Sequence, residues 1–387
     1  QELGDRLWRH VANLALPRSA VPALVIAAIA FGWSVWKYPD LRIGDVQTGV
    51  PELKPDSRYN QDSAEIARNF FIGVDVLKVI AQVPQYGCVQ KPLMETIDNY
   101  AWHIQNTPGV ASVLSLPQVA RFLNEGLSEG APKWLVLPRN RAALSETTHA
   151  VPSTAGLQNL DCSAMPVQIY TTDHKAETIS RIVAATKAYN QEHQDEGVNF
   201  ALASGNVGVM AATNEEIKRT ELTVIIWVHL TLLIFVLISF RSFAAVICII
   251  TPLVLCSLLT YGGMATLDIG MKSATLPVAA FGVGIGVDAG IYIWSVIARY
   301  LEEGYGLRDA YFEALRRTGK AALFTSLSLI VAVFTWLFSD LQFQRDMGAL
   351  LLFMFTTNLF GAILLLPALA WVVLPRSGGN AAAPAAV

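Results

Sequence analysis

The chain has 387 residues, of which 53% are hydrophobic and 15% charged, and its formal net charge is −3 at pH 7. Soluble domains carry about 25% charged residues, so this composition indicates a membrane protein. The small net charge excludes the strongly basic surface expected of a nucleic-acid partner. A bilayer core requires roughly 20 apolar residues per helix. Six segments qualify as membrane spans: 19–36, 222–240, 244–267, 274–298, 321–338 and 347–374.

The first apolar segment is short enough to resemble a signal peptide. No small-x-small cleavage site follows it, because the next residues are Lys37-Tyr-Pro-Asp40. We therefore expect a retained span, which gives one span, a long insertion and five more spans. The chain begins with Gln1 rather than Met, which favours a processed or partial piece of something longer.

Basic residues in the short flanks predict the orientation of the spans. With the N-terminus inside, ten basic residues flank the inner side and two the other, so we expect cytoplasmic segments at 1–18 and 375–387. The long segment 37–221 is then outside. The inner set is Arg6, Arg9, Arg18, Arg241, Arg299, Arg308, Arg316, Arg317, Lys320 and Arg376, and the outer pair is Lys272 and Arg345.

Residues 37–221 have the pattern of an α+β domain. A strand at 75–83 places Leu77, Val79, Ala81 and Val83 on one face, and a helix at 91–106 stops before Pro108-Gly109. Two β-α-β units in series predict a ferredoxin-like sheet. The insertion between them, 117–165, is rich in Pro, Gly and Ser and predicts a short helical cap plus loops. The remaining elements are strands at 110–116, 167–171 and 198–202 and a helix at 177–193.

Four cysteines divide into two pairs. Cys248 and Cys256 lie in the third span, where small apolar packing is the simplest interpretation. Cys88 follows the first strand of the α+β domain, and Cys162 precedes the third. Those strands are antiparallel neighbours in a ferredoxin-like sheet, so we expect a disulfide between Cys88 and Cys162 in an oxidising compartment.

Asp288 is the only Asp, Glu, Lys or Arg within 274–298 and lies near the middle of that span. A carboxylate at the centre of a bilayer costs several kcal/mol and usually marks a functional path. The favoured hypothesis is a proton relay. The alternative is a neutral carboxyl that only forms a hydrogen bond with a neighbouring helix.

Helical spacing gives the fourth span two distinct faces. Gly284, Tyr292 and Ser295 share the face of Asp288. Gly282, Gly286 and Gly290 lie four residues apart on roughly the opposite side, as two overlapping G-x-x-x-G steps that allow close helix packing. We therefore expect helix packing at these glycines, Gly284 included.

The one-plus-five spans, the ferredoxin-like domain and Gly284-Ile-Gly-Val-Asp288 resemble one half of a resistance-nodulation-division (RND) transporter. The most similar branch is that of the predicted exporters, with the hopanoid exporters and the mycobacterial large membrane proteins, and Patched-type proteins are more distant. Residues 51–60, Asn358 and 366–369 are also typical of the branch. The resemblance implies that this chain is the C-terminal half of a transporter and that a homologous N-terminal six-span half is its partner.

The resemblance also implies roles for individual residues. Asp288 matches the proton site of the family. Many relatives place a Tyr directly after the Asp, but here that position is Ala289, and the nearest phenol on the same face is Tyr292. Packing of the fourth and fifth spans makes hydroxyls of the fifth span candidate relay partners, although each could instead bond to its own helix backbone. These hydroxyls belong to Thr325, Ser326 and Ser328.

Two further polar residues lie in other spans. His229, in the second span, is a titratable candidate, but a structural or interfacial role is favoured for it. Asn358, in the last span, is expected to hold helices together rather than to titrate.

The segment 299–318 contains an amphipathic helix that we expect along the cytoplasmic membrane surface. Its apolar stripe is Leu307, Ala310, Tyr311, Ala314 and Leu315.

The sequence has no nucleotide-binding G-x-x-x-x-G-K, no Cys/His cluster with metal spacing and no G-x-S-x-G. The sequence therefore gives no support to an enzymatic activity. We expect no cofactor, and we expect a proton gradient as the energy source.

Three hypotheses remain for the function. The first is a proton-driven exporter in a bacterial inner membrane, which moves a hydrophobic or lipid-like substrate toward the periplasm or outer membrane with a periplasmic carrier or accessory protein. The second is a protein-translocation motor of the SecD/SecF type. The third is a sterol- or lipid-sensing membrane protein without transport. The substrate has no signature in the sequence.

Overall fold

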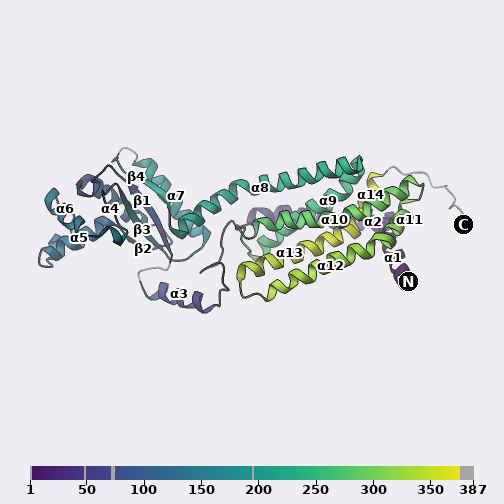
Figure 1. Cartoon of the computed structure of the whole chain (residues 1–387), viewed down its shortest axis with the longest axis horizontal. Helices are drawn as coiled ribbons and strands as arrows, with labels where there is room; N and C mark the ends of the chain where they lie inside the picture. The colour runs from purple at the N-terminus through teal and green to yellow at the C-terminus, as the bar shows by residue number, and fades with distance from the viewer. Residues whose placement is uncertain (1, 48, 71–74, 194–195, 375–387) are drawn as a thin grey trace. The chain divides into compact units, whose positions relative to one another are not determined.

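The computed structural model describes residues 2–47, 49–70, 75–193 and 196–374. Gln1 and the predicted tail at 375–387, with Arg376, lie outside the described residues. The chain forms two compact units, one of Gln1–Ile43 with Ile217–Val387 and one of Gly44–Glu216 (Figure 1).

The second unit contains an antiparallel sheet in the order β2-β3-β1-β4. This order confirms the predicted ferredoxin-like fold. Leu77, Val79 and Ala81 alternate into the core, as the sequence predicts. The hydroxyls of Tyr100 and Thr186 lie 2.9 Å apart and join the two long helices inside that core. The elements are β1 Val76–Gln82, α4 Lys91–Gln105, β2 Val110–Leu114, β3 Ala164–Thr171, α7 Ala176–Glu192 and β4 Asn199–Ser204.

The insertion is more helical than expected. Two helices, α5 Leu116–Leu127 and α6 Arg141–His149, replace the predicted short cap. Strand β2 ends at Leu114 rather than at 116, because Ser115 forms a capping box with Gln118 and starts α5.

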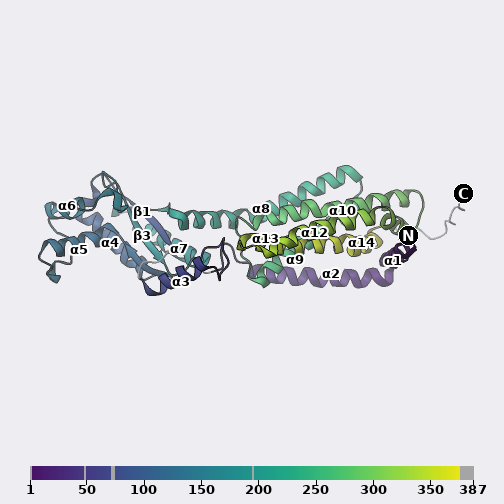
Figure 2. The same cartoon turned by 60° about the horizontal axis from the view of Figure 1, so that its bottom comes forward.

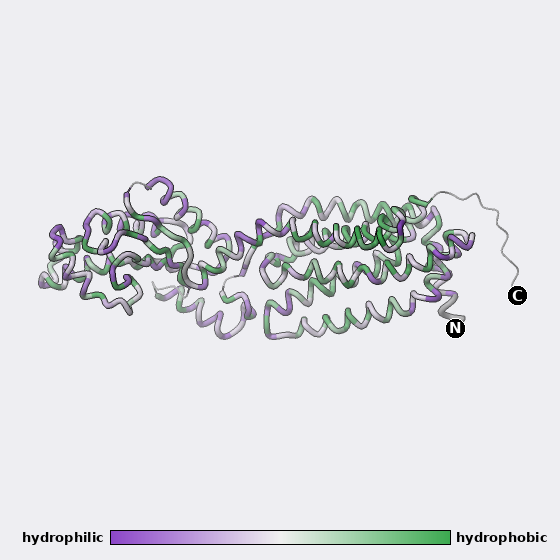
Figure 3. Tube along the Cα trace, turned by 45° about the horizontal axis from the view of Figure 1, so that its top comes forward, coloured by the Kyte–Doolittle hydropathy of each residue, from purple (hydrophilic) through white to green (hydrophobic). Residues whose placement is uncertain are grey.

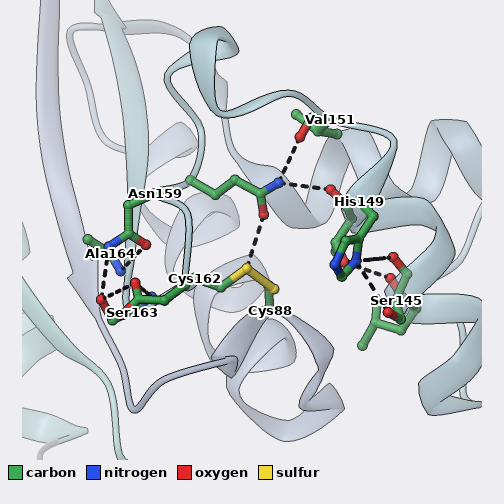
Figure 4. Close-up of a disulfide and its surroundings, with 12 residues drawn as sticks. Cys88, Ser145, His149, Val151, Asn159, Cys162, Ser163 and Ala164 are labelled. Carbon is green, nitrogen blue, oxygen red and sulfur yellow. Dashed lines mark hydrogen bonds between the residues drawn. A yellow bond between two sulfur atoms is a disulfide. The ribbon is translucent and has the colours of Figure 1, made fainter.

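Cys88 and Cys162 form a disulfide, as predicted (Figure 4). β1 pairs with β3 in antiparallel register up to Gln82 and Ala164, which brings the two cysteines together with their Cα atoms 5.5 Å apart. Beside the disulfide, the Gln158 amide donates to the carbonyls of Thr148 and Val151 and ties the loop after α6 to that helix.

A compact turn precedes helix α3 Arg58–Asn69. The buried Asn60 side chain organises it: its Oδ1 accepts from the main-chain N–H of Val50, and its Nδ2 donates to the carbonyl of Lys54, at 2.9 Å each. One amide thus supplies hydrogen-bond partners that the loop backbone lacks.

Six helical segments of the described chain are long and apolar enough to cross a membrane, as predicted (Figure 3). Those containing α9, α10 and α13 are about half buried among their neighbours, whereas those containing α2, α8 and α12 are largely peripheral. Helix α2 packs on α9 and on α14 (Figure 2). The helices of this unit are α1 Glu2–Ala12, α2 Pro17–Lys37, α9 Phe243–Leu267, α10 Leu276–Glu302, α11 Leu307–Ala314, α12 Lys320–Phe334, α13 Gln342–Phe360 and α14 Leu366–Val373, together with the part of α8 Gly205–Phe240 from Ile217 on.

Helix α8 begins 17 residues before the predicted second span. Gly205 has φ +83° and opens the helix directly after β4. An added Cβ there would lie 3.2 Å from the carbonyl oxygen of Val76, so glycine suits this junction for two reasons. The apolar pattern reveals only the part of the helix that is uniformly hydrophobic.

Two helices contain a π turn. Leu315–Gly319 joins α11 to α12, and Gly361–Leu365 joins α13 to α14. The predicted amphipathic segment is therefore continuous with the fifth span. Its stripe residues Ala310, Tyr311 and Ala314 are fully buried, and α11 packs against α10 and α1. Protein, rather than lipid, covers the apolar stripe.

Candidate functional site

Helix α10 presents its small residues to α13. A Cβ at Gly282 would lie 2.0 Å from Sδ of Met354, and one at Gly286 would lie 2.0 Å from Nδ2 of Asn358. A Cβ at Gly290 would be in ordinary van der Waals contact with Ile249 of α9, at 3.5 Å. Gly282 and Gly286 therefore lie where α10 approaches α13 closely, and Gly290 lies beside α9.

Gly284 does not belong to this interface. An added Cβ there would meet no atom within 4 Å in the described part of the chain, so the described helices do not pack against it. The residue lies on the other side of α10, together with Asp288, Tyr292 and Ser295, and all four are exposed on the outside of the helices. The sequence analysis placed Gly284 both on the face of Asp288 and among the packing glycines, and the structure places it on the face of Asp288.

The expected relay residues line one pocket of about 90 Å³. Asp288 and Tyr292 come from α10, Thr325 and Ser326 from α12, and Asn358 from α13. A carboxyl, a phenol, hydroxyls and an amide around a space larger than a water molecule can hold and pass a proton. The remaining lining residues are Ile285, Gly286, Ala289, Ala322, Leu329, Phe355 and Leu359.

The hydroxyls of this region differ in their hydrogen bonds. Thr325 donates to the carbonyl of Ala321 in its own helix, 2.9 Å away, which is the alternative role considered for it. Ser326 is half-buried, and Ser328 is exposed. Ser295 donates to the carbonyl of Tyr292 at 2.9 Å. Ser326 is thus the hydroxyl of α12 placed best to act in the pocket.

Asn358 is buried and donates from Nδ2 to the carbonyl of Gly282 at 2.9 Å. The expectation that it holds helices together is confirmed. Its Oδ1 is buried and has no hydrogen-bond partner in the described structure.

His229 lies away from Asp288. Its Nδ1 is 3.0 Å from the carbonyl of Ile225, and its Nε2 is 3.4 Å from the hydroxyl of Ser257. It lines an apolar cavity of about 370 Å³ between α2, α8 and α9, beside Tyr38 and Tyr261. Sequence reasoning missed this cavity, because its walls come from three helices whose mutual placement no motif records.

A buried ion pair was also missed. Nζ of Lys272 lies 3.2 Å from a carboxylate oxygen of Asp346, and the Gln342 amide donates to the other oxygen at 2.8 Å. The sequence offered Lys272 only as a flanking charge. Its partner is 74 positions away on α13, so no local spacing could reveal the pair.

Six apolar spans with a ferredoxin-like insertion and a mid-span carboxyl pocket define a polytopic protein with the architecture of a membrane transporter. The chain belongs to the MMPL family, whose profile matches residues 91–383. The MMPL family is part of the RND superfamily of membrane transporters. The chain is also 25% identical to a protein of Methanocaldococcus jannaschii. The match extends over 336 residues and covers 84% of each of the two proteins. The name of that protein indicates a membrane protein and states no function.

Proposed function

We propose that the protein is the C-terminal half of a proton-driven exporter, with Asp288 as the group that binds and releases the proton. The observation that carries the proposal is the pocket that joins Asp288 to the polar side chains of α12 and α13. Membership of the MMPL family favours an exporter over a protein-translocation motor.

Proton binding at Asp288 would change which helix packing is favoured. A charged carboxylate requires polar or hydrated surroundings, whereas a neutral carboxyl tolerates apolar ones. The membrane potential adds about 2.3 kcal/mol per charge per 100 mV if the proton crosses the whole field. The close α10–α13 contact at Gly282 and Gly286 would pass a shift of α10 to α13.

The proposed substrate is hydrophobic or lipid-like and moves toward the periplasm or outer membrane. The apolar cavity between α2, α8 and α9 supports this class, because apolar walls with a few polar groups suit a lipid that has a small polar head. The polar groups are those of Tyr38, His229, Ser257 and Tyr261. A periplasmic carrier or accessory protein would receive the substrate.

The proposed partner is a homologous six-span half. Gly284, Asp288, Tyr292 and Ser295 form an exposed face in this chain, and a carboxyl facing hydrocarbon is unfavourable. A second bundle would cover that face and enclose the pocket. The size of the purified complex tests this proposal. A complex that contains a single copy of this chain, without a second half, and is fully active would contradict it.

The decisive experiment is Asp288→Asn in proteoliposomes with an imposed pH gradient. The probe is extraction of a fluorescent NBD-labelled phospholipid, and Asp309→Asn, an exposed carboxyl of α11, is the matched control. Asn keeps the shape of Asp but cannot exchange a proton, so we expect loss of gradient-driven extraction with normal expression. Extraction by the Asn variant at the wild-type rate would refute the relay and favour the lipid-sensing alternative, for which the apolar cavity would then be the binding site.

A further inference from the structure

The π turn between α13 and α14 has a cause in the sequence. Pro367 has no N–H and cannot donate the helical hydrogen bond to the carbonyl four residues earlier, which is that of Ile363. The proline ring also crowds that carbonyl in a regular α-helix. The backbone responds with the wider turn Gly361–Leu365, in which the N–H of Leu366 donates to the carbonyl of Gly361.

Tyr311 supplies the hydrogen bond that Pro367 cannot. Its hydroxyl donates to the carbonyl oxygen of Ile363 at 2.7 Å. Tyr311 lies on α11, is fully buried and packs in one cluster with Ala362 and Leu366, on either side of the acceptor. Within a membrane span a main-chain carbonyl has no water to bond with, so this side chain stabilises the π turn directly.

The π turn determines which faces of the last helix are buried. It contains one more residue than an α turn, so it rotates the residues before it relative to those after it. Met354 and Asn358, before the turn, face α10, and Leu366 and Ala370, after it, are fully buried in the cluster of α9 and α11. Asn358 is five residues before Ile363, or roughly 7.5 Å along the helix.

We propose that Tyr311 is a positioning residue of the proton site: by holding the π turn at Ile363, it keeps Asn358 in the pocket of Asp288. The inference rests on the proposed function of Asp288. Tyr311 itself acts through the helix that contains Asn358. Asp288 and Tyr292 are the titratable groups that line the pocket, and α12 and α13 contribute hydroxyls and an amide.

The test measures Asp288 without a substrate. A hydrophobic carbodiimide reacts with a protonated carboxyl, so labelling of Asp288 in the full-length protein in liposomes, read by mass spectrometry over a pH series, gives the midpoint of its protonation. Tyr311→Phe removes the donor. Pro367→Ala gives the helix its own N–H, so that the turn can close without Tyr311. Tyr305→Phe, an exposed tyrosine before α11, is the control.

We expect both Tyr311→Phe and Pro367→Ala to move the labelling midpoint by about 0.5 pH unit or more, which is about a threefold change in the protonation equilibrium. Tyr305→Phe should leave the midpoint unchanged. Wild-type midpoints in the folded Tyr311 and Pro367 variants would overturn the proposal, since a purely structural tyrosine alters yield and not titration. If Tyr311→Phe does not fold, Pro367→Ala decides alone. An Asp288 that is never labelled in the wild type would instead refute the proposed function.

Discussion

The amide of Asn358 donates to the carbonyl of Gly282 across the interface between α13 and α10, at 2.9 Å. The same amide occupies the space where a side chain at Gly286 would begin. The hydrogen bond and the two glycines therefore form one structural unit, because the amide reaches the backbone of α10 only where side chains are absent.

Gly286→Ala should disrupt this interface. The added methyl would lie 2.0 Å from Nδ2 of Asn358, and moving the amide would break its hydrogen bond. We expect a loss of stability of about 1–3 kcal/mol, the usual range for overpacking. The loss of stability is measured by unfolding the purified protein in detergent with increasing amounts of a denaturing surfactant. Gly263→Ala, in α9, is the matched control, because a methyl there meets no described atom within 4 Å and Gly263 is not part of the proposed partner face. Equal losses for both variants would contradict the assigned interface.

The hydroxyls of α12 should contribute unequally to transport. Thr325 already donates to its own helix, so Thr325→Val should change gradient-driven lipid extraction by less than about twofold. Ser326→Ala should reduce it by about fivefold, the value of one hydrogen bond near 1 kcal/mol. Ser328→Ala controls for a general effect on the helix. A larger effect at Thr325 than at Ser326 would show that the assignment of Ser326 is wrong.

Removal of the disulfide should destabilise the α+β domain by about 2–4 kcal/mol, because the bond closes a loop between residues 74 positions apart. Cys88→Ala, Cys162→Ala and the double variant should lose the same amount, since all three remove one bond. Pulse proteolysis of the domain over a urea series provides the measurement. In non-reduced, denatured wild-type protein, maleimide should label neither Cys88 nor Cys162.

His174 should make the α+β domain less stable at higher pH. Burial lowers the pKa of His174, but the hydrogen bond and charge of Asp75, 2.9 Å from Nδ1, and the charges of Asp45 and Glu52 raise it above its ordinary value overall. Because the pKa of His174 is raised in the folded state, its protonation stabilises the domain. This stabilisation is complete at pH values below the unfolded-state pKa of about 6.5. That contribution is lost as the pH rises through the folded value.

The test of this prediction measures the urea concentration at the midpoint of unfolding at pH 5.5 and at pH 8.5. The difference between the two midpoints is then compared between variants. We expect His174→Gln to reduce this difference, whereas the exposed His149→Gln should leave it as in the wild type. An unchanged pH dependence in His174→Gln would mean that another group causes it.

The features that the sequence predicted depend on periodicity along one chain segment. Apolar length predicted the six spans, and the alternation of Leu77, Val79 and Ala81 predicted a strand. The order of the strands placed Cys88 beside Cys162. The helix start at Ser115 is also predictable from the sequence, because Ser115 and Gln118 have capping-box spacing.

The features that the sequence did not predict depend on contacts between distant segments. Pro367 alone signals an irregular turn, but its consequence depends on Tyr311, 52 positions before Ile363. Lys272, between α9 and α10, and Asp346, on α13, are charges of ordinary appearance until folding buries them together. The apolar cavity beside His229 is a property of three packed helices, each of which looks like a plain membrane span.

The hydrogen bonds of Asn60 determine where the protein tolerates a tag or a fluorescent label. Because one amide joins Val50, Lys54 and the first turn of α3, an insertion between these residues would separate donors from their acceptors and unravel the turn. Gly130, after α5, has φ +72° and open space beside its Cα, and its N–H donates to the carbonyl of Glu125 at 2.9 Å, within the local turn that ends α5. A label inserted there would extend into solvent and leave the sheet and its disulfide intact, so that site suits single-molecule work on the working transporter.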